Sequence, residues 1–143
     1  MNKIVLSSFL VFLLALTHVQ ATSMDETMMA VKHAHPLPNL MRVIQQHKNE
    51  LNLSVEQKQE LESWIKEHRA KLQELALSIR DGEKALAEVA LNGAPKTDIL
   101  VQLDELLKKR REMASIKIDC RDNMRQLLGE DKWKQVVALY KGM

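Results

Sequence analysis

The sequence predicts an all-α protein built around one long antiparallel helical hairpin. Two segments, 54–91 and 97–128, carry apolar residues at alternating steps of four and three, which is the period of a helix with one buried face. The turn-forming run Asn92-Gly93-Ala94-Pro95 separates them. Aromatic residues make up only 3% of the chain, so Leu, Ile, Val and Met must fill the core, as they do in helical bundles.

The first residues are expected to be a secretory signal rather than part of the fold. Met1-Asn2-Lys3 gives a short basic start, residues 4–16 form an apolar run, and Val19-Gln20-Ala21 fits a small-residue cleavage site. The apolar run is too short for a comfortable membrane span, which favours a cleaved signal over an uncleaved anchor. We therefore assign 1–21 as a signal peptide, predict a periplasmic protein and expect no membrane span after cleavage.

Residues 22–36 are predicted to be a flexible arm, because small and polar residues dominate them without a period. Methionine and histidine recur in this arm, and their thioether and imidazole groups suit Cu, Ni and Zn ions. Two interpretations stay open for the arm: a disordered terminus without a ligand, and a weak metal collector.

A short first helix is expected over 40–51, about three turns long. Asn39 is a good N-cap for it, and two prolines precede that residue. The long helix then starts at once, because Ser54 and Gln57 form a capping box in which each side chain satisfies the backbone N–H of the other residue. So short a link predicts that the first helix folds across the second as a hook.

The two long helices each carry an apolar stripe that runs most of their length. On the first the stripe is Leu61, Ile65, His68, Leu72, Leu75, Ile79, Gly82, Leu86 and Val89, and on the second it is Ile99, Leu103, Leu106, Arg110, Met113, Lys117, Cys120, Met124 and Leu127. Such helices reach about 55 Å, more than a compact globule needs. We therefore expect a supercoiled hairpin and a homodimer formed along the long helices.

A short fourth helix is expected after Gly129, which suits the position just beyond a helix end. Glu130 and Asp131 place negative charge on its first turn, and Trp133 and Val136 lie on one face. The folded domain is thus predicted over 37–143, with a short helix at each end of the long hairpin.

Composition and motifs exclude several functions. The formal net charge is +2, and no basic-aromatic module accompanies it, so nucleic-acid binding is set aside. The chain has no nucleophile elbow, no His-Glu-x-x-His and no phosphate-binding glycine loop. We predict that the protein is not an enzyme and requires no cofactor.

Two stretches at predicted helix starts resemble each other and a known signature. Leu53-Ser54-Val55-Glu56-Gln57 and Leu128-Gly129-Glu130-Asp131-Lys132-Trp133 are similar to the Leu-Thr-x-x-Gln motif of the Spy/CpxP family of exported proteins. The first copy has Ser for Thr, and the second keeps the leucine, the acidic turn and the tryptophan. The resemblance covers the domain over 37–143 and implies a hooked hairpin that dimerises into a curved cradle. The family includes chaperones of envelope stress and periplasmic metal sensors or metal-resistance proteins.

Cys120 and Met124 are the leading metal-ligand candidates, because residues four apart lie on one helix face and both donors are soft. The resemblance to CnrX-type sensors implies a His-x-x-x-Met pair at this place, with cysteine here in place of the histidine. His47 and His35 are the candidates that would complete the site, with Cu, Ni or Zn as the ion. Three fates of Cys120 stay open: a buried core residue, a disulfide between two chains, and a ligand.

Arg110 and Arg111, in the basic run 108–111, are candidate contacts for acidic parts of a client protein, and an exposed Trp64 would be an apolar one. The plainer interpretation is that the basic run is a solvated face and that Trp64 packs inside the bundle.

The sequence and the resemblance together leave two candidate functions. The first is a chaperone-like protein of the envelope stress response that binds unfolded or misfolded envelope proteins. The alternative is a heavy-metal sensor or metal-resistance protein, and the resemblance adds a membrane stress or metal-signalling regulator as a candidate partner.

Overall fold

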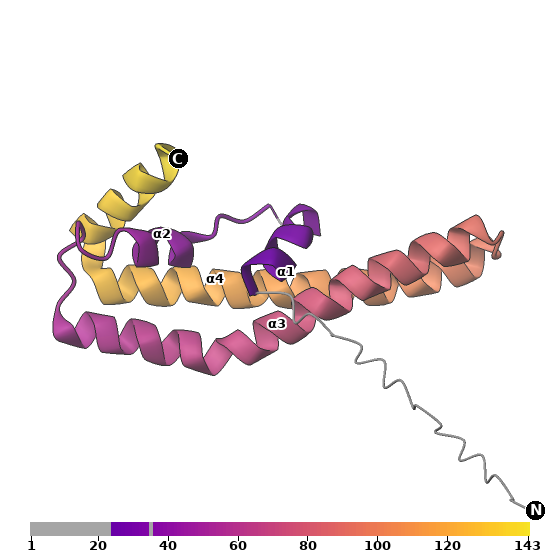
Figure 1. Ribbon diagram of the computed structural model, residues 1–143, viewed down its shortest axis with the longest axis horizontal. Helices are drawn as coiled ribbons and strands as arrows, with labels where there is room; N and C mark the ends of the chain where they lie inside the picture. The colour runs from indigo at the N-terminus through magenta and orange to yellow at the C-terminus, as the bar shows by residue number, and fades with distance from the viewer. Residues whose placement is uncertain (1–23, 35) are drawn as a thin grey trace, which may run out of the picture.

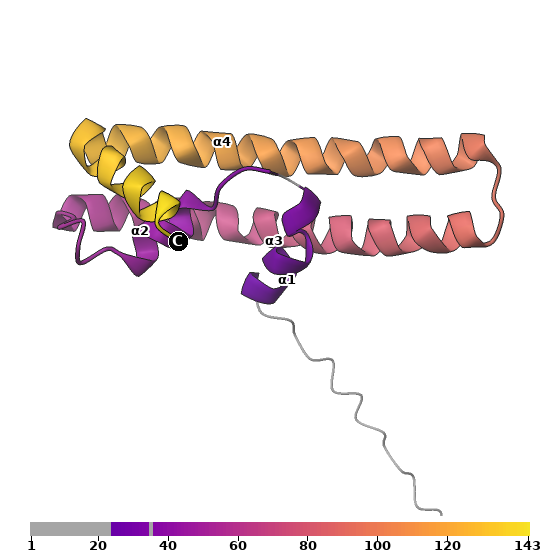
Figure 2. The same cartoon turned by 90° about the horizontal axis from the view of Figure 1, so that it is seen from above.

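The computed structural model describes residues 24–34 and 36–143. These contain α1 (Met24–Ala30), a 3-10 helix η1 (Lys32–Ala34), α2 (Leu40–Gln46), α3 (Val55–Leu91) and α4 (Lys96–Lys141), and no strand. α3 and α4 run side by side as a long hairpin; α2 and the last turns of α4 lie at the end away from the hairpin turn, and α1 lies near the middle (Figures 1 and 2). The predicted all-α hairpin is confirmed. The predicted signal peptide, 1–21, lies outside the described residues.

The start of α3 has the capping box that the sequence predicts. The Ser54 hydroxyl accepts a hydrogen bond from the Gln57 backbone N–H at 3.2 Å, and the Ser54 N–H donates to Gln57 Oε1 at 3.1 Å. Gln57 Nε2 also donates to the Leu127 carbonyl at 2.9 Å, and Lys132 Nζ donates to Gln57 Oε1 at 2.8 Å. The cap of α3 is therefore tied to the far part of α4.

The two predicted apolar stripes face inward, and every residue of both is buried or half-buried. In the middle of the hairpin, Leu75, Ala76, Ile79, Leu106 and Met113 form one buried cluster together with Val31. Beyond it, from residue 83 to residue 105, no residue is buried. The half of the hairpin next to the turn therefore lacks a closed core of its own within a single chain.

A second buried cluster holds the hooked end together. It joins α2, the turns that follow α2, the start of α3 and the second half of α4, and its members are Leu40, Val43, Ile44, Leu51, Leu53, Leu61, Cys120, Met124, Leu128 and Val136. Each fully buried aliphatic side chain of this kind contributes about 1.5–3 kcal/mol of transfer free energy. This cluster is what makes the first helix fold across the hairpin, as the short link predicts.

The first helix of the hook is shorter than predicted. α2 ends at Gln46 rather than near Leu51, and the chain continues through turns from His47 to Asn52. The residues after His47 are polar, and Asn52 has a positive φ of 44°, which a continuing helix cannot contain. Leu51 is still buried, because the turns point it into the core at the hooked end.

The predicted flexible arm differs from the structure over its described part. Residues 24–30 form α1 and residues 32–34 form η1, and Val31 between them is fully buried against the hairpin. Methionine, glutamate and alanine favour a helix, and burial of Val31 fixes it in place. Seven residues are too few for a helical period to be visible in the sequence.

The predicted break at Gly129 is present as a sharp bend within α4. Gly129 has φ 72° and ψ 169°, so α4 consists of two helical pieces that meet at this residue. The last piece turns away from the hairpin axis (Figure 1). Val136 from this piece reaches the core at the hooked end, so the bend folds the chain terminus back onto the bundle.

Candidate functional site

Cys120 and Met124 lie together in the core at the hooked end, and both are buried. Burial raises the pKa of the Cys120 thiol to about 11, and the nearby Lys117 ammonium only partly opposes that effect. In the absence of a metal the thiol is therefore protonated at neutral pH, as is usual for a buried cysteine. The burial of Cys120 and Met124 in the core agrees with their place on the predicted apolar stripe of α4.

Of the two histidines proposed to complete a metal site, only His47 lies within the described residues. The His47 ring is engaged through Nδ1 with Glu50 Oε1 at 2.9 Å, in the turns that follow α2. His35 lies outside the described residues. Within residues 24–34 and 36–143, no three side chains of His, Cys, Asp or Glu form a group that could hold a metal ion.

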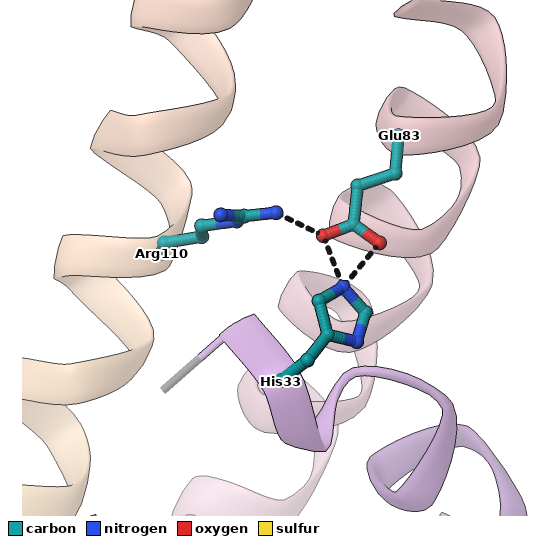
Figure 3. A network of polar contacts seen from close by, with 3 residues as sticks. All are labelled: His33, Glu83 and Arg110. Carbon is teal, nitrogen blue, oxygen red and sulfur yellow. Dashed lines mark hydrogen bonds and ion pairs between the residues drawn. The ribbon is translucent and has the colours of Figure 1, made fainter. Parts of the chain in front are cut away.

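Arg110, a predicted client contact, forms an ion pair inside the hairpin. Its Nη2 donates to Glu83 Oε1 on α3, and His33 of η1 brings Nε2 within 2.9 Å of both oxygens of the same carboxylate (Figure 3). All three side chains converge where the arm crosses the hairpin. The neighbouring Arg111, the other predicted client contact, is exposed.

Trp64, the predicted aromatic client contact, is half-buried rather than exposed. Its ring stacks on the His68 ring, with centroids 4.0 Å apart and planes 9° from parallel. His68 Nδ1 also lies 2.9 Å from the Trp64 carbonyl oxygen one turn earlier. The structure thus places His68 as a packing partner of Trp64, and both help to shape the surface of α3 beside the hook.

A pocket that the sequence did not reveal lies where α1, α2, α3 and α4 approach one another. Its volume is about 550 Å³. Part of its wall is apolar, from Leu40, Met41, Trp64, Ile65 and Leu72. The other part is basic, from Arg42 of α2, Arg69 of α3, and Lys117 and Arg121 of α4. No motif could have found it, because its basic residues come from three helices without a fixed spacing.

An apolar surface lies on the outer side of α4 near the hairpin turn. Leu100, Val101 and Leu107 are exposed there, with Val101 at 64%. Val101 and Leu107 line a shallow groove together with Asp104, Glu105, Lys108 and Arg111. We call Leu100, Val101 and Leu107 the outer α4 surface. It combines exposed aliphatic groups with charges of both signs.

No helix in the described part of the chain is long and apolar enough to cross a membrane. Comparisons with protein-family models, with curated proteins and with solved structures gave no match for this chain. The similarity of its two helix-start motifs to the Spy/CpxP family therefore stays a prediction from the sequence.

Proposed function

We propose that this protein is a chaperone-like binder of unfolded or misfolded proteins in the periplasm. The observation that carries the proposal is the outer α4 surface, where Leu100, Val101 and Leu107 stay exposed in the folded chain. Exposed aliphatic groups that lie together on a folded surface are typical of interaction sites. At the hairpin turn nearby, Leu91 adds a further apolar side chain that is 80% exposed.

The chemistry of this surface suits clients without a fixed sequence. Apolar contact is non-directional and needs no particular geometry in the partner. Asp104, Glu105, Lys108 and Arg111 surround the aliphatic groups and offer charges of both signs to a passing segment. Binding of this kind is weak and reversible, and it needs neither a nucleotide nor a deep cleft.

The proposal includes a homodimer, because the hairpin is incompletely covered in one chain. Residues 83–105 contain no buried side chain, although Leu86, Val89, Ile99 and Leu103 lie on the inner stripes. A second copy packed along α3 and α4 would bury these residues, as in a coiled-coil interface. The family resemblance adds the expectation that such a dimer is curved.

A periplasmic location rests on the predicted signal peptide. Cleavage after Ala21 would leave Thr22 as the first residue of the mature protein. Mass spectrometry of protein from a periplasmic extract checks this directly, since an intact Met1 in a membrane fraction would contradict export.

The metal-sensor alternative receives less support from the site. Within residues 24–34 and 36–143, no further His, Cys, Asp or Glu side chains complete a three-ligand group with Cys120. The pocket beside Cys120 is lined by four basic side chains, and like charge disfavours a metal cation there. The basic lining therefore opposes the binding of Cu, Ni or Zn at Cys120 and Met124.

The test is suppression of aggregation of a chemically reduced test protein, measured by light scattering without nucleotide. We expect the wild-type protein to slow aggregation, and the double variant Val101→Ser, Leu107→Ser to do so much less. The control is Val55→Ser, which removes an equally exposed valine, also at 64%, from the opposite end of the hairpin. Equal suppression by all three proteins would remove the outer α4 surface from the mechanism.

A further inference from the structure

We propose that the pocket among α1, α2, α3 and α4 binds a small amphiphilic carboxylate, of the kind represented by a medium-chain fatty acid. The site is separate from the outer α4 surface and stands independently of the proposed chaperone function. Its size is the first argument. At about 550 Å³ it falls within the range of roughly 300–1,000 Å³ that small-molecule pockets occupy.

The charge of the lining is the second argument. Among the described side chains that line the pocket, four are basic and none is a carboxylate. Arg121 has a local partner, because its Nη2 lies 2.7 Å from Asp122 Oδ1. The side chains of Arg42, Arg69 and Lys117 have no hydrogen-bond or ion-pair partner within residues 24–34 and 36–143. Three basic groups therefore face one space without a neutralising anion.

Lys117 is the pocket cation whose charge is least well solvated. It is half-buried, and that burial lowers the pKa of its ammonium group. A charged group withdrawn from water is stabilised by a partner of opposite sign. A bound carboxylate would supply that partner, and Arg42 and Arg69 could add charge-assisted hydrogen bonds.

The apolar wall selects an amphiphile over a bare anion. Trp64, Ile65 and Leu72 on α3 face the same space as Leu40 and Met41 on α2, and Met28 of α1 adds to the lining. Burial of an alkyl chain against such groups contributes about 0.8 kcal/mol for each CH₂ group. The apolar and basic parts of the wall together match a molecule with an alkyl body and one anionic end.

Binding can be measured with decanoate as the probe, by isothermal titration calorimetry below the concentration at which the probe forms micelles. Trp64 provides a second readout, since a ligand beside its ring should change its fluorescence. We expect saturable binding of one decanoate for each chain. Decanol and decylammonium, which keep the alkyl chain without the negative charge, should bind at least tenfold more weakly, and inorganic phosphate should also bind at least tenfold more weakly.

Two variants identify the site. Arg69→Gln removes an exposed pocket cation without a partner and should weaken decanoate binding about fivefold to tenfold. Lys66→Gln is the matched control, because Lys66 is an exposed cation on the same helix that does not line the pocket. Lys117→Met should also weaken binding and should leave the fold intact, since it replaces a half-buried charge by an apolar group of similar length.

Several outcomes would overturn the proposal. They are absence of saturable binding, equal affinity for decanol or phosphate, and equal losses in Arg69→Gln and Lys66→Gln. The double variant Val101→Ser, Leu107→Ser should bind decanoate like the wild type. Loss of chaperone activity in that variant with decanoate binding intact would show that the two sites are independent.

Discussion

Glu83 on α3 forms an ion pair with Arg110 on α4, across the middle of the hairpin and partly shielded from water. His33 of η1 shares the same carboxylate, so one acidic side chain holds both the second long helix and the N-terminal arm (Figure 3). Arg110 Nε is buried and has no hydrogen-bond partner. Glu83 is therefore the group that balances the Arg110 charge at this point.

Replacement of Glu83 by Gln should destabilise the protein by about 1–3 kcal/mol, because it leaves the half-buried guanidinium of Arg110 without a counter-charge. Urea unfolding followed by circular dichroism measures the change. Glu88→Gln is the control, since Glu88 is an exposed glutamate on the same helix. Equal midpoints for the two variants would show that the ion pair contributes nothing to stability.

Cys120 should contribute stability that is lost in alkaline solution. Its pKa is raised from 9.0 to about 11 in the folded chain, so the unfolded state releases the thiol proton first as pH rises. The stabilising contribution is fully present below pH 9 and is lost as pH rises from 9 to about 11. Cys120→Ala lacks this titration, and the difference in unfolding free energy between wild type and variant should shrink over that range.

The same thiol should react slowly. A buried, protonated cysteine should resist a thiol reagent at pH 8 and react only when the chain opens. Cys120→Ser should cost stability and leave the affinity for Cu, Ni or Zn unchanged in calorimetric titration. A loss of metal affinity of tenfold or more in Cys120→Ser would instead restore Cys120 as a ligand.

Gly129 should be intolerant of a side chain. Its φ of 72° with ψ of 169° lies in a region that essentially only glycine adopts, so Gly129→Ala should cost about 1–3 kcal/mol of stability. Gly142 is the matched control, because it ends the same helix with φ −87°, which alanine adopts readily. If thermal unfolding gave the same midpoint for both variants, the bend would not depend on a glycine.

The homodimer can be checked by analytical ultracentrifugation. We expect a dimer at micromolar concentration, since no residue over 83–105 is fully buried within one chain. Leu86→Glu together with Leu103→Glu should shift the protein toward monomer. A wild-type monomer that does not change with loading concentration would contradict the proposed assembly.

The sequence predicts the hairpin well because its apolar residues recur with a helical period over many turns. The stripes, the capping box at Ser54, the turn at Gly93 and the bend at Gly129 all follow from local chemistry. The helix α1 was missed, because its docking depends mainly on Val31, one residue whose partners lie far along the chain. Tertiary contact decides such short elements, and seven residues cannot display a period.

The sites were harder to predict than the fold. Cys120 and Met124 are adjacent on a helix face in the core, as their spacing indicates, but spacing does not show what else lies beside them. The excess of basic groups around the pocket arises only when Arg42, Arg69 and Lys117 come together from three helices. Likewise, the engagement of Arg110 by Glu83 depends on the register of α3 against α4, which the sequence pattern leaves open.

The most direct measurement of the central claim is a binding titration with a fluorescently labelled client protein. The client is used in two forms, a variant that cannot fold and the folded wild type. Fluorescence anisotropy should show saturable binding of the unfolded form alone, and the double variant Val101→Ser, Leu107→Ser should bind it at least fivefold more weakly than Val55→Ser does. Equal binding of folded and unfolded forms, or equal affinities for the two variants, would contradict client recognition by the outer α4 surface.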